Sequence, residues 1–394
     1  MPWLYLLLIA PFGASSGFLT VALGWKLAQA GVGTEAIAGV TALGYLPHSW
    51  KFLWAPLVDF TFGRRRWYQA STAVLLAGFV LMGWAGDHAH IGLLSAAVLA
   101  ANLAASFSGM AVESLMAHGT PDDRKGRAAG WFQAGNLGGA GLGGGFALAL
   151  IERGWSAASA AALLVALLAA CAAVVLRVPP GERVAPGAVG AALRALRSDL
   201  GAVLRSRGGQ LALAVCFLPI GTGAAANLWP AVAGDWQAGA GTVAWVNGTV
   251  SGFISAAGCL AGGWCCDRMD RRGAYCLFGG VQVALLLAMA AAPRSEAMFV
   301  GFASAYAFAN GLSYAAFSAV ALEAIGRGAA ATKYNLLASL SNMPIGWVTL
   351  ADGWGHARWG ATGLLLTESA LALAGIACFV ALAAWRRPVV MPSS

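Results

Sequence analysis

Four ionisable side chains lie within long apolar stretches of the sequence, where they could bind or release a proton. Glu113 and Glu323 each lie toward the end of such a stretch, and Lys51 follows His48 by about one helical turn. An ionised group in apolar surroundings is unfavourable unless it is paired or loses its charge. We therefore predict Glu113 and Glu323 as proton-coupling groups. His48 is a third candidate, because imidazole titrates near neutral pH.

Each of these side chains also has a purely structural interpretation. The two glutamates would then lie at a polar boundary and pair with an arginine of the following loop. Lys51 either faces a cavity, where Glu113 or an anionic solute neutralises it, or extends its ammonium group to the boundary. His48 is either a titrating group or a hydrogen-bonded structural one. Both interpretations stay open at the level of the sequence.

Two further carboxylates are each followed by a cluster of basic residues. Asp59 precedes Arg64, Arg65 and Arg66, and Asp267 precedes Arg268, Arg271 and Arg272. Such groups can pair with one another and with helix ends across an interface. We predict that they are gating latches that hold one closed state. The alternative is that these charges only set the orientation of the chain.

The composition places these residues in a membrane protein. Residues of the AVILMFWYC set make up 59% of the 394 positions, and only 10% are charged, against about 25% in an average soluble chain. The 16 tryptophans and 17 phenylalanines exclude a disordered chain. We therefore predict an all-α, multi-pass membrane protein.

Twelve apolar stretches each approach the ~20 residues that cross ~30 Å of hydrocarbon. They are 3–23, 36–56, 67–86, 91–117, 128–151, 155–177, 209–231, 241–264, 274–292, 297–325, 333–352 and 361–385. We expect an N-terminal six-helix bundle over 1–177 and a C-terminal one over 209–394. The segment 178–208 between them is a linker, either with a short interfacial helix or as a plain basic loop.

The distribution of lysine and arginine predicts the orientation. With both termini in the cytoplasm, the inner loops and ends carry nineteen of these residues and the outer loops four. Positive charge concentrates on the cytoplasmic side of membrane proteins. We therefore expect a multi-pass protein of the cell inner membrane that contacts lipid. The net charge of +8 does not indicate nucleic-acid binding, because the basic residues lie between apolar stretches.

The two halves repeat each other at an offset near 208 residues. The matching pairs are Pro11–Gly13 with Pro219–Gly221, Asp59 with Asp267, Phe107–Glu113 with Phe317–Glu323, and Asn136 with Asn342. Four matches in the same order favour two homologous bundles with the same orientation, related by an axis along the membrane normal.

Other patterns exclude several functions or predict packing. The seven cysteines and five histidines show no ligand spacing, so we expect no metal and no cofactor. Gly135, Gly139 and Gly143 recur every four residues and predict a close helix contact. We interpret this contact as one that permits sliding between the halves.

Three segments carry a resemblance to a known family. Gly262–Arg272 resembles the loop signature of the major facilitator superfamily. Trp50–Asp59, followed by Gly63–Arg66, is similar to the corresponding segment of the branch that contains the AmpG-type muropeptide permeases, acetyl-CoA transporters and siderophore-uptake proteins. Thr332–Ser341 also resembles that branch. The sequence departs from it at Phe60, where arginine is usual, and around Glu113.

The resemblance implies two pseudo-symmetric six-helix bundles around a midplane cavity that opens to one side at a time. It implies a secondary transporter, not an enzyme, that moves a bulky polar solute (muropeptide-, siderophore- or acyl-CoA-like) together with protons. The alternatives are a proton-driven multidrug exporter of the same fold and a polytopic membrane enzyme. We expect a monomer. The residues expected to line the cavity are Lys51, Tyr45, Asn102, Asn227, Trp245, Asn247, Asn310, Tyr314 and Asn335.

Overall fold

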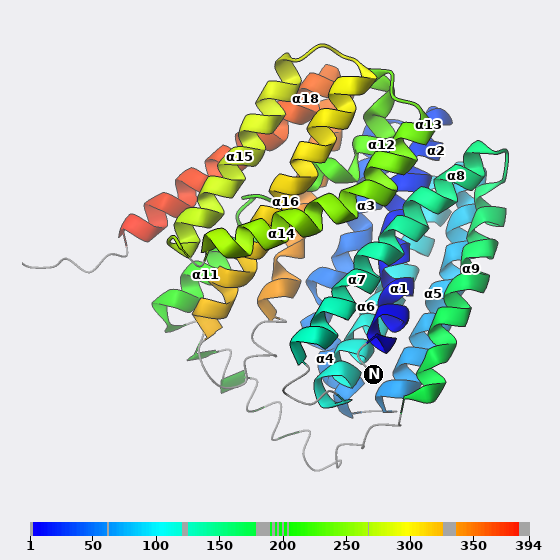
Figure 1. Ribbon diagram of the computed structural model, residues 1–394, viewed down its shortest axis with the longest axis horizontal. Helices are drawn as coiled ribbons and strands as arrows, with labels where there is room; N and C mark the ends of the chain where they lie inside the picture. The colour runs from blue at the N-terminus through cyan, green and yellow to red at the C-terminus, as the bar shows by residue number, and fades with distance from the viewer. Residues whose placement is uncertain are drawn as a thin grey trace, which may run out of the picture.

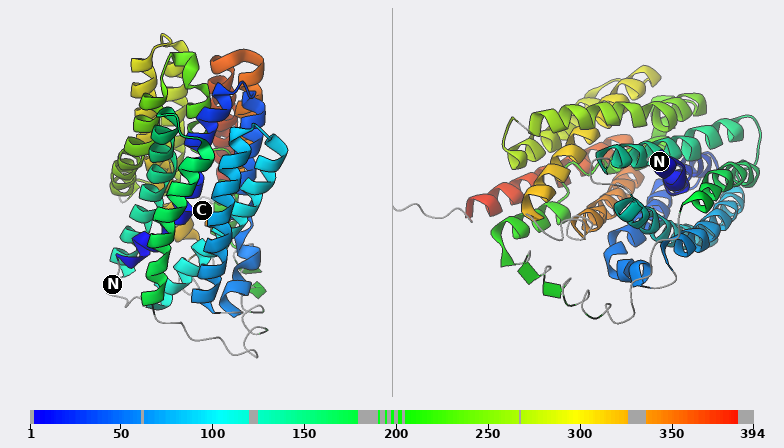
Figure 2. Two further views of the ribbon diagram at one scale, coloured as in Figure 1. Left: turned by 90° about the vertical axis from the view of Figure 1, so that its right-hand side faces the viewer. Right: turned by 60° about the horizontal axis from the view of Figure 1, so that its bottom comes forward.

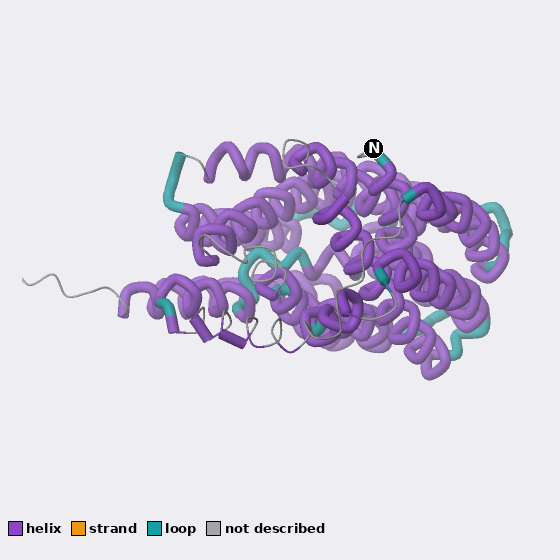
Figure 3. Tube along the Cα trace, turned by 90° about the horizontal axis from the view of Figure 1, so that it is seen from below, coloured by secondary structure: helices purple, strands orange, loops and turns teal. Residues whose placement is uncertain are grey.

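The computed structural model of the chain describes residues 3–60, 63–119, 125–178, 205–266, 268–325 and 336–385, with six single positions between 190 and 202. Asp267 and Asn335 lie outside the described residues, as do the side chains of Asp59 and Glu323 and most of the expected linker helix. Every regular element in the described part is a helix (Figure 3).

Eight helices of the described part are long and apolar enough to cross a membrane. One of them, Leu336–Ala384, has 49 residues and leaves helical geometry at Trp359 and Gly360, so it supplies two spans. Gly360 has a φ of +63°, which a residue without a Cβ atom adopts readily. Gly363 lies against Gly355 across this turn. Three further segments, α3 with α4, α11 with α12, and α16, complete the predicted twelve.

The first half of the chain forms six of these segments. Its elements are α1 (Leu4–Gly17), η1 (Phe18–Leu23), α2 (Gly24–Gln29), α3 (Thr34–Ser49), α4 (Lys51–Phe60), α5 (Arg64–Asp87), α6 (Ile91–Gly119), α7 (Lys125–Gly141), η3 (Leu142–Phe146), α8 (Ala147–Glu152), α9 (Ala157–Ala173) and η4 (Val174–Arg177).

The second half forms the other six. Its elements are α11 (Arg207–Phe217), η6 (Ala224–Asn227), α12 (Trp229–Val232), η7 (Ala233–Trp236), α13 (Ala240–Val243), η8 (Ala244–Val250), α14 (Ser251–Cys266), α15 (Arg271–Ala291), α16 (Glu296–Ile325) and α18 (Asn342–Trp385).

The two halves form two bundles that lie side by side (Figure 1). The helices run lengthwise between two ends of the molecule (Figure 2). We call the end near the start of α1 and the end of η4 the lower end, and the opposite end the upper end. The expected twelve-span, all-α fold with two bundles is confirmed.

Several predicted spans are interrupted. The second breaks at Trp50, between α3 and α4, and Pro47 withholds an N–H from the last turns of α3. The seventh ends its first helix at Phe217 and resumes only at η6, with Gly221 and Gly223 at positive φ. The eleventh, expected to end at 352, continues as helix to Arg358. These breaks place backbone and side-chain polar groups inside the bundle.

Contacts between the two halves gather toward the upper end. There α2 packs on α12, α8 on α13 and η3 on η8, and the first part of α18 packs along α3. The backbones of Gly145 and Gly248 approach so closely that a Cβ atom on Gly248 would lie 2.4 Å from the Cα atom of Gly145. The halves are therefore closed against each other at this end.

The glycine stripe of α7 and η3 makes the predicted close contact, but with a different partner. Cβ atoms built on Gly135, Gly139 and Gly143 would lie within 2.3 Å of carbonyl oxygens of α1, which belongs to the same half. The expectation that this stripe lies between the halves is therefore wrong. The wrong assignment arose because spacing identifies a bare helix face but not the helix that covers it.

Replacing Gly139 with alanine should destabilise the protein. Its Cβ atom would lie 2.3 Å from the Ala10 carbonyl oxygen, so α1 and α7 must move apart, at about 1–3 kcal/mol. The control is Gly138→Ala in the preceding position, which is exposed with nothing within 4 Å. Thermal unfolding in detergent should show a lower Tm for the first variant alone. Equal Tm values for the two variants would contradict the contact.

Candidate functional site

A cavity of about 360 Å³ lies between the two bundles, below the closed upper end. Its first-half lining comes from α1, η1, α3, α4, α6 and α7, and its second-half lining from α16 and residues 338–342. The polar and charged residues of the lining are Ser16, Thr20, Thr41, Tyr45, His48, Lys51, Asn102, Ser106, Glu113, Asn136, Tyr314, Ser341 and Asn342. A concave site with convergent polar groups is typical of small-molecule binding.

Lys51 and Glu113 form an ion pair in this cavity. The Lys51 Nζ atom lies 3.2 Å from Glu113 Oε1, and the two side chains are 17% and 25% exposed. Lys51 begins α4 directly after the break at Trp50, which turns its side chain toward α6. Each charge neutralises the other where solvation is limited. Of the interpretations left open for Lys51, the geometry agrees with the cavity-facing one.

His48 lies one turn before Lys51 on the same wall of the cavity. Its Nε2 atom lies 3.3 Å from Asn102 Oδ1, and Asn102 Nδ2 donates to the Val98 carbonyl at 2.9 Å. This second bond orients the amide, so His48 Nε2 must be the donor. The ring also packs edge-on against Phe12. His48 Nδ1 is buried and has no partner among the described residues.

A chain of hydrogen bonds joins the two halves above the cavity. The Tyr45 hydroxyl donates to Asn227 Oδ1 at 2.8 Å, and Asn227 Nδ2 donates to Thr349 Oγ1 at 3.1 Å. Thr349 in turn donates to the Ile345 carbonyl. Tyr45 belongs to α3, whereas the other groups belong to the second half. Asn227, predicted as a cavity residue, is instead buried in this connection.

The upper end carries a second polar cluster, within the second half. His356 Nε2 lies 2.7 Å from Asp235 Oδ2, and Arg294 donates to the Thr362 hydroxyl at 2.9 Å. The Arg294 guanidinium also lies over the Trp236 ring at 4.3 Å. Partial burial lowers the pKa of Arg294, against an opposing effect of Asp235.

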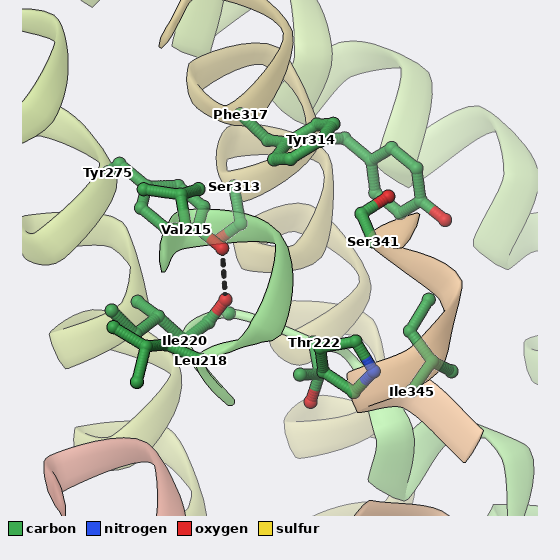
Figure 4. A pocket seen from close by; sticks show the side chains of 12 residues that line it. Val215, Leu218, Ile220, Thr222, Tyr275, Ser313, Tyr314, Phe317, Ser341 and Ile345 are labelled. Atoms are coloured by element: carbon green, nitrogen blue, oxygen red, sulfur yellow. Dashed lines mark hydrogen bonds between the residues drawn. The ribbon is translucent and has the colours of Figure 1, made fainter. Parts of the chain in front are cut away.

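A smaller cavity of about 40 Å³ adjoins the central one (Figure 4). Tyr314, Phe317 and Ser341 line both cavities. On its far side the Tyr275 hydroxyl donates to the Ile220 carbonyl at 2.6 Å, and Thr222 lies between the two sides. A volume of this size holds about one or two water molecules.

Three of the remaining predicted cavity residues lie elsewhere. Trp245 lies in an exposed groove between the halves, lined by α7, η3, α8 and α14. Asn310 packs against Gly223, and its Oδ1 atom is buried without a hydrogen bond in the described part. Asn247 lies in η8, also with an unbonded, buried Oδ1 atom. Asn335 and the Glu323 side chain lie outside the described residues.

The structure describes only part of the predicted latches, because Asp267 and the Asp59 side chain lie outside the described residues. Arg65 donates to the Val178 carbonyl at 3.5 Å. Arg268 donates to the Trp264 carbonyl and lies over the Trp264 ring. Arg64 is buried, and Arg66 is exposed. Arg271 and Arg272 open α15. The role of these residues as latches stays a prediction.

Two acidic residues are absent from the predicted site. Asp352 ends the expected span 333–352, and Glu368 lies within the expected span 361–385. Both are buried in the structure, at 0% and 2% exposure. A signal was present: each acid lies eight residues from Gly360, so a tight turn there places both at the same depth.

Twelve membrane-length segments in two six-helix bundles around a polar cavity define a polytopic membrane transporter. The chain belongs to the major facilitator superfamily, since the family model described as "Major Facilitator Superfamily" matches residues 3–344. It is therefore a transporter and not an enzyme. The superfamily prediction is confirmed, whereas the muropeptide-permease branch stays a prediction.

Two further comparisons complete the picture. A comparison with curated protein sequences finds no match. Among solved structures, the fold is similar to that of a D-xylose–proton symporter, with a TM-score of 0.74 and 12% identity over 97% of this chain and 96% of that one. At this identity the similarity concerns the fold.

Proposed function

We propose that this transporter imports a bulky polar solute together with protons across the cell inner membrane, with its lower end in the cytoplasm. Nineteen basic residues lie on the lower side in this orientation and four on the opposite side, which supports the orientation. The resemblance of Trp50–Arg66 to the muropeptide-permease branch favours a muropeptide-, siderophore- or acyl-CoA-like solute.

The ion pair of Lys51 and Glu113 in the central cavity is the observation that carries this proposal. When Glu113 takes up a proton, Lys51 loses its counter-ion and becomes available to a carboxylate or phosphate of the solute. The bound anion in turn removes the attraction that opposed protonation of Glu113. Proton and anionic solute therefore favour each other's binding, which is the thermodynamic requirement for symport.

The rest of the cavity lining supports a polar cargo. Tyr45, His48, Asn102 and Asn136 offer hydrogen-bond donors and acceptors from the first half, and Tyr314 and Ser341 add hydroxyls from the second. An exporter of apolar drugs would bind its cargo by burying apolar surface, and charged groups would have to be desolvated at a cost. The lining thus favours the importer over the drug exporter.

Ligand screening by thermal shift should identify the solute. A ligand that binds only the folded protein at 100 times its Kd stabilises it by about 2.7 kcal/mol. We expect one of three classes, anhydro-muropeptides, siderophores or acyl-CoA, to raise the Tm of the purified protein. If none of the three classes raises the Tm, the branch assignment is overturned, whereas membership of the superfamily is unaffected.

Uptake into proteoliposomes tests the coupling. We expect an inward proton gradient to accumulate the stabilising solute, and a protonophore to reduce accumulation by about tenfold, equivalent to about 1.4 kcal/mol. In an exporter the same gradient would instead expel solute preloaded into the vesicles. Uptake that is indifferent to the collapsed gradient would overturn proton coupling.

A further inference from the structure

Two carboxyl groups meet in the interior of the second half, away from the central cavity. Asp352 and Glu368 lie on the two arms of α18, and their side chains interact directly, within reach of a hydrogen bond. Both residues are almost entirely shielded from solvent. At 1.5 Å per residue, each lies about 12 Å below the turn at Gly360, which is within the hydrocarbon layer.

The hydrogen bonds around Glu368 suit an ionised carboxylate. Its Oε1 atom accepts from the Tyr306 hydroxyl at 2.6 Å and from the Thr222 hydroxyl at 3.3 Å. Its Oε2 atom accepts from the Ala225 backbone N–H at 2.8 Å. The break between α11 and η6 makes this N–H available, because no helix precedes it to use it. Three donors on one buried carboxylate stabilise the charge.

Asp352 has the opposite surroundings. Neither of its carboxyl oxygens accepts a hydrogen bond from a described donor. A bare carboxylate at such a position would carry the full penalty of burying a charge, beside a second negative charge. A protonated Asp352 avoids both, and its O–H group can donate to Glu368.

The other titratable groups around the pair do not provide a counter-ion. Tyr306 on α16 donates its proton to Glu368. On α3, which packs against the first arm of α18, Glu35 lies next to Gly353 but is exposed. The broken segment of the seventh span contributes the hydroxyl of Thr222 and backbone groups. No cation among the described residues forms an ion pair with either acid.

Thr222 connects this pair to the central cavity. Its hydroxyl bonds Glu368, and the residue also lines the 40 Å³ cavity of Figure 4. That cavity shares Tyr314 and Ser341 with the central one. Water in the small cavity would complete a hydrogen-bonded route from the central cavity through Thr222 to Glu368.

We propose that Asp352 and Glu368 form a proton-binding site that holds one shared proton, exchanged with the central cavity through Thr222. Loss of the proton breaks the O–H bond of the pair, releases H⁺ to cavity water and changes the charge of the pair from −1 to −2. The two carboxylates then repel each other in a low-dielectric interior.

The repulsion acts on the element that closes the upper end. Asp352 lies on the arm of α18 that packs along α3, where Gly353 contacts Ala38. Glu368 lies on the other arm and is held by the seventh and tenth spans through Thr222, Ala225 and Tyr306. Deprotonation would push the first arm away from these spans and disturb its packing between them and the first half. The proton thus stabilises the packing of this arm at the upper end.

Infrared spectroscopy of the full chain in lipid nanodiscs tests the proton itself. At pH 7 the wild type should show a carbonyl-stretch band of a protonated carboxylic acid that shifts to lower frequency in D₂O. Asp352→Asn should lose this band, whereas Glu35→Gln should keep it. A wild type without the band, or a band that persists unchanged in Asp352→Asn, would overturn the site.

The pH dependence of unfolding gives a second readout. Raising the pH from 6 to 9 should lower the Tm of the wild type and of Glu35→Gln by the same amount. In Asp352→Asn, which has no proton to lose, the fall should shrink by at least half. An Asp352→Asn variant that follows the wild type at every pH would contradict the proposal.

The role of this site in coupling rests on the proposed proton symport, but its test does not. Both measurements use no solute and no gradient. Uptake that is independent of protons would therefore overturn the proposed function and leave the proton site standing. Failure of the infrared prediction would overturn the proposed proton-binding site even if uptake proved to be proton-driven.

Discussion

Glu113→Gln is expected to reduce gradient-driven accumulation of the solute by about tenfold or more, equivalent to about 1.4 kcal/mol in the coupled step. The amide can still accept a hydrogen bond from Lys51 Nζ, which now lies 3.2 Å from Glu113 Oε1, but it cannot bind or release a proton. Exchange of labelled for unlabelled solute, which needs no net proton movement, should stay within about threefold of the wild type. Equal losses of accumulation and exchange would show that Glu113 serves binding and not coupling.

Lys51→Met should have a different profile. Without the cation, an anionic solute loses its partner, so both accumulation and exchange should fall. The lone Glu113 charge should also destabilise the protein by about 1–3 kcal/mol. The double variant Lys51→Met/Glu113→Gln should recover most of this stability without recovering transport. Arg153→Gln removes an exposed cation and is the control, with uptake expected to be unchanged.

Asn227→Leu is expected to release the upper end. The substitution removes the hydrogen bond from Tyr45, which crosses between the halves, and the one to Thr349, which lies within the second half. Only the first of these favours closure, and its loss of about 1 kcal/mol shifts a two-state equilibrium about fivefold. Tyr45→Phe removes the same crossing bond and should give a shift of similar size. Both variants should populate conformations in which the upper end is open.

Distances between spin labels would measure this shift. Labels at Gln29 and Gly239, which are exposed on either side of the upper end, should separate in both variants, in a background without native cysteines. Tyr68→Phe is the matched control. It removes a 2.8 Å bond to the Leu8 carbonyl within the first half, so it should lower stability and leave the distance unchanged. The tie between the halves would be refuted if all three variants gave the wild-type distance.

The fold was predictable because its signals are strong and local. A span needs about 20 apolar residues, and basic loops mark their ends. Lys51 and Glu113 were also predictable as partners, since a charge within an apolar stretch needs one. The breaks at Trp50 and after Phe217 were not, because residues such as Pro47 and Gly221 weaken a helix without specifying where it resumes.

Contacts between distant segments were the hardest part to predict. The stripe at Gly139 indicates a close approach of another helix, yet any of eleven other spans could supply that helix. In the structure the partner is α1. Asp352 was missed for a related reason. Next to tryptophans and a histidine its segment resembles a loop, and only the position of the turn at Gly360 shows that it faces Glu368.

Asp87 restricts how spans of the first half can move relative to one another. Its carboxylate bonds the ammonium group of Lys26 at 2.8 Å and accepts from the backbone N–H groups of Ala157 and Ala158. One side chain thus anchors the first, third and sixth spans to a common point. These three spans cannot shear past one another without breaking that anchor. Bending between these three spans is thereby suppressed, so they must move together as one rigid unit.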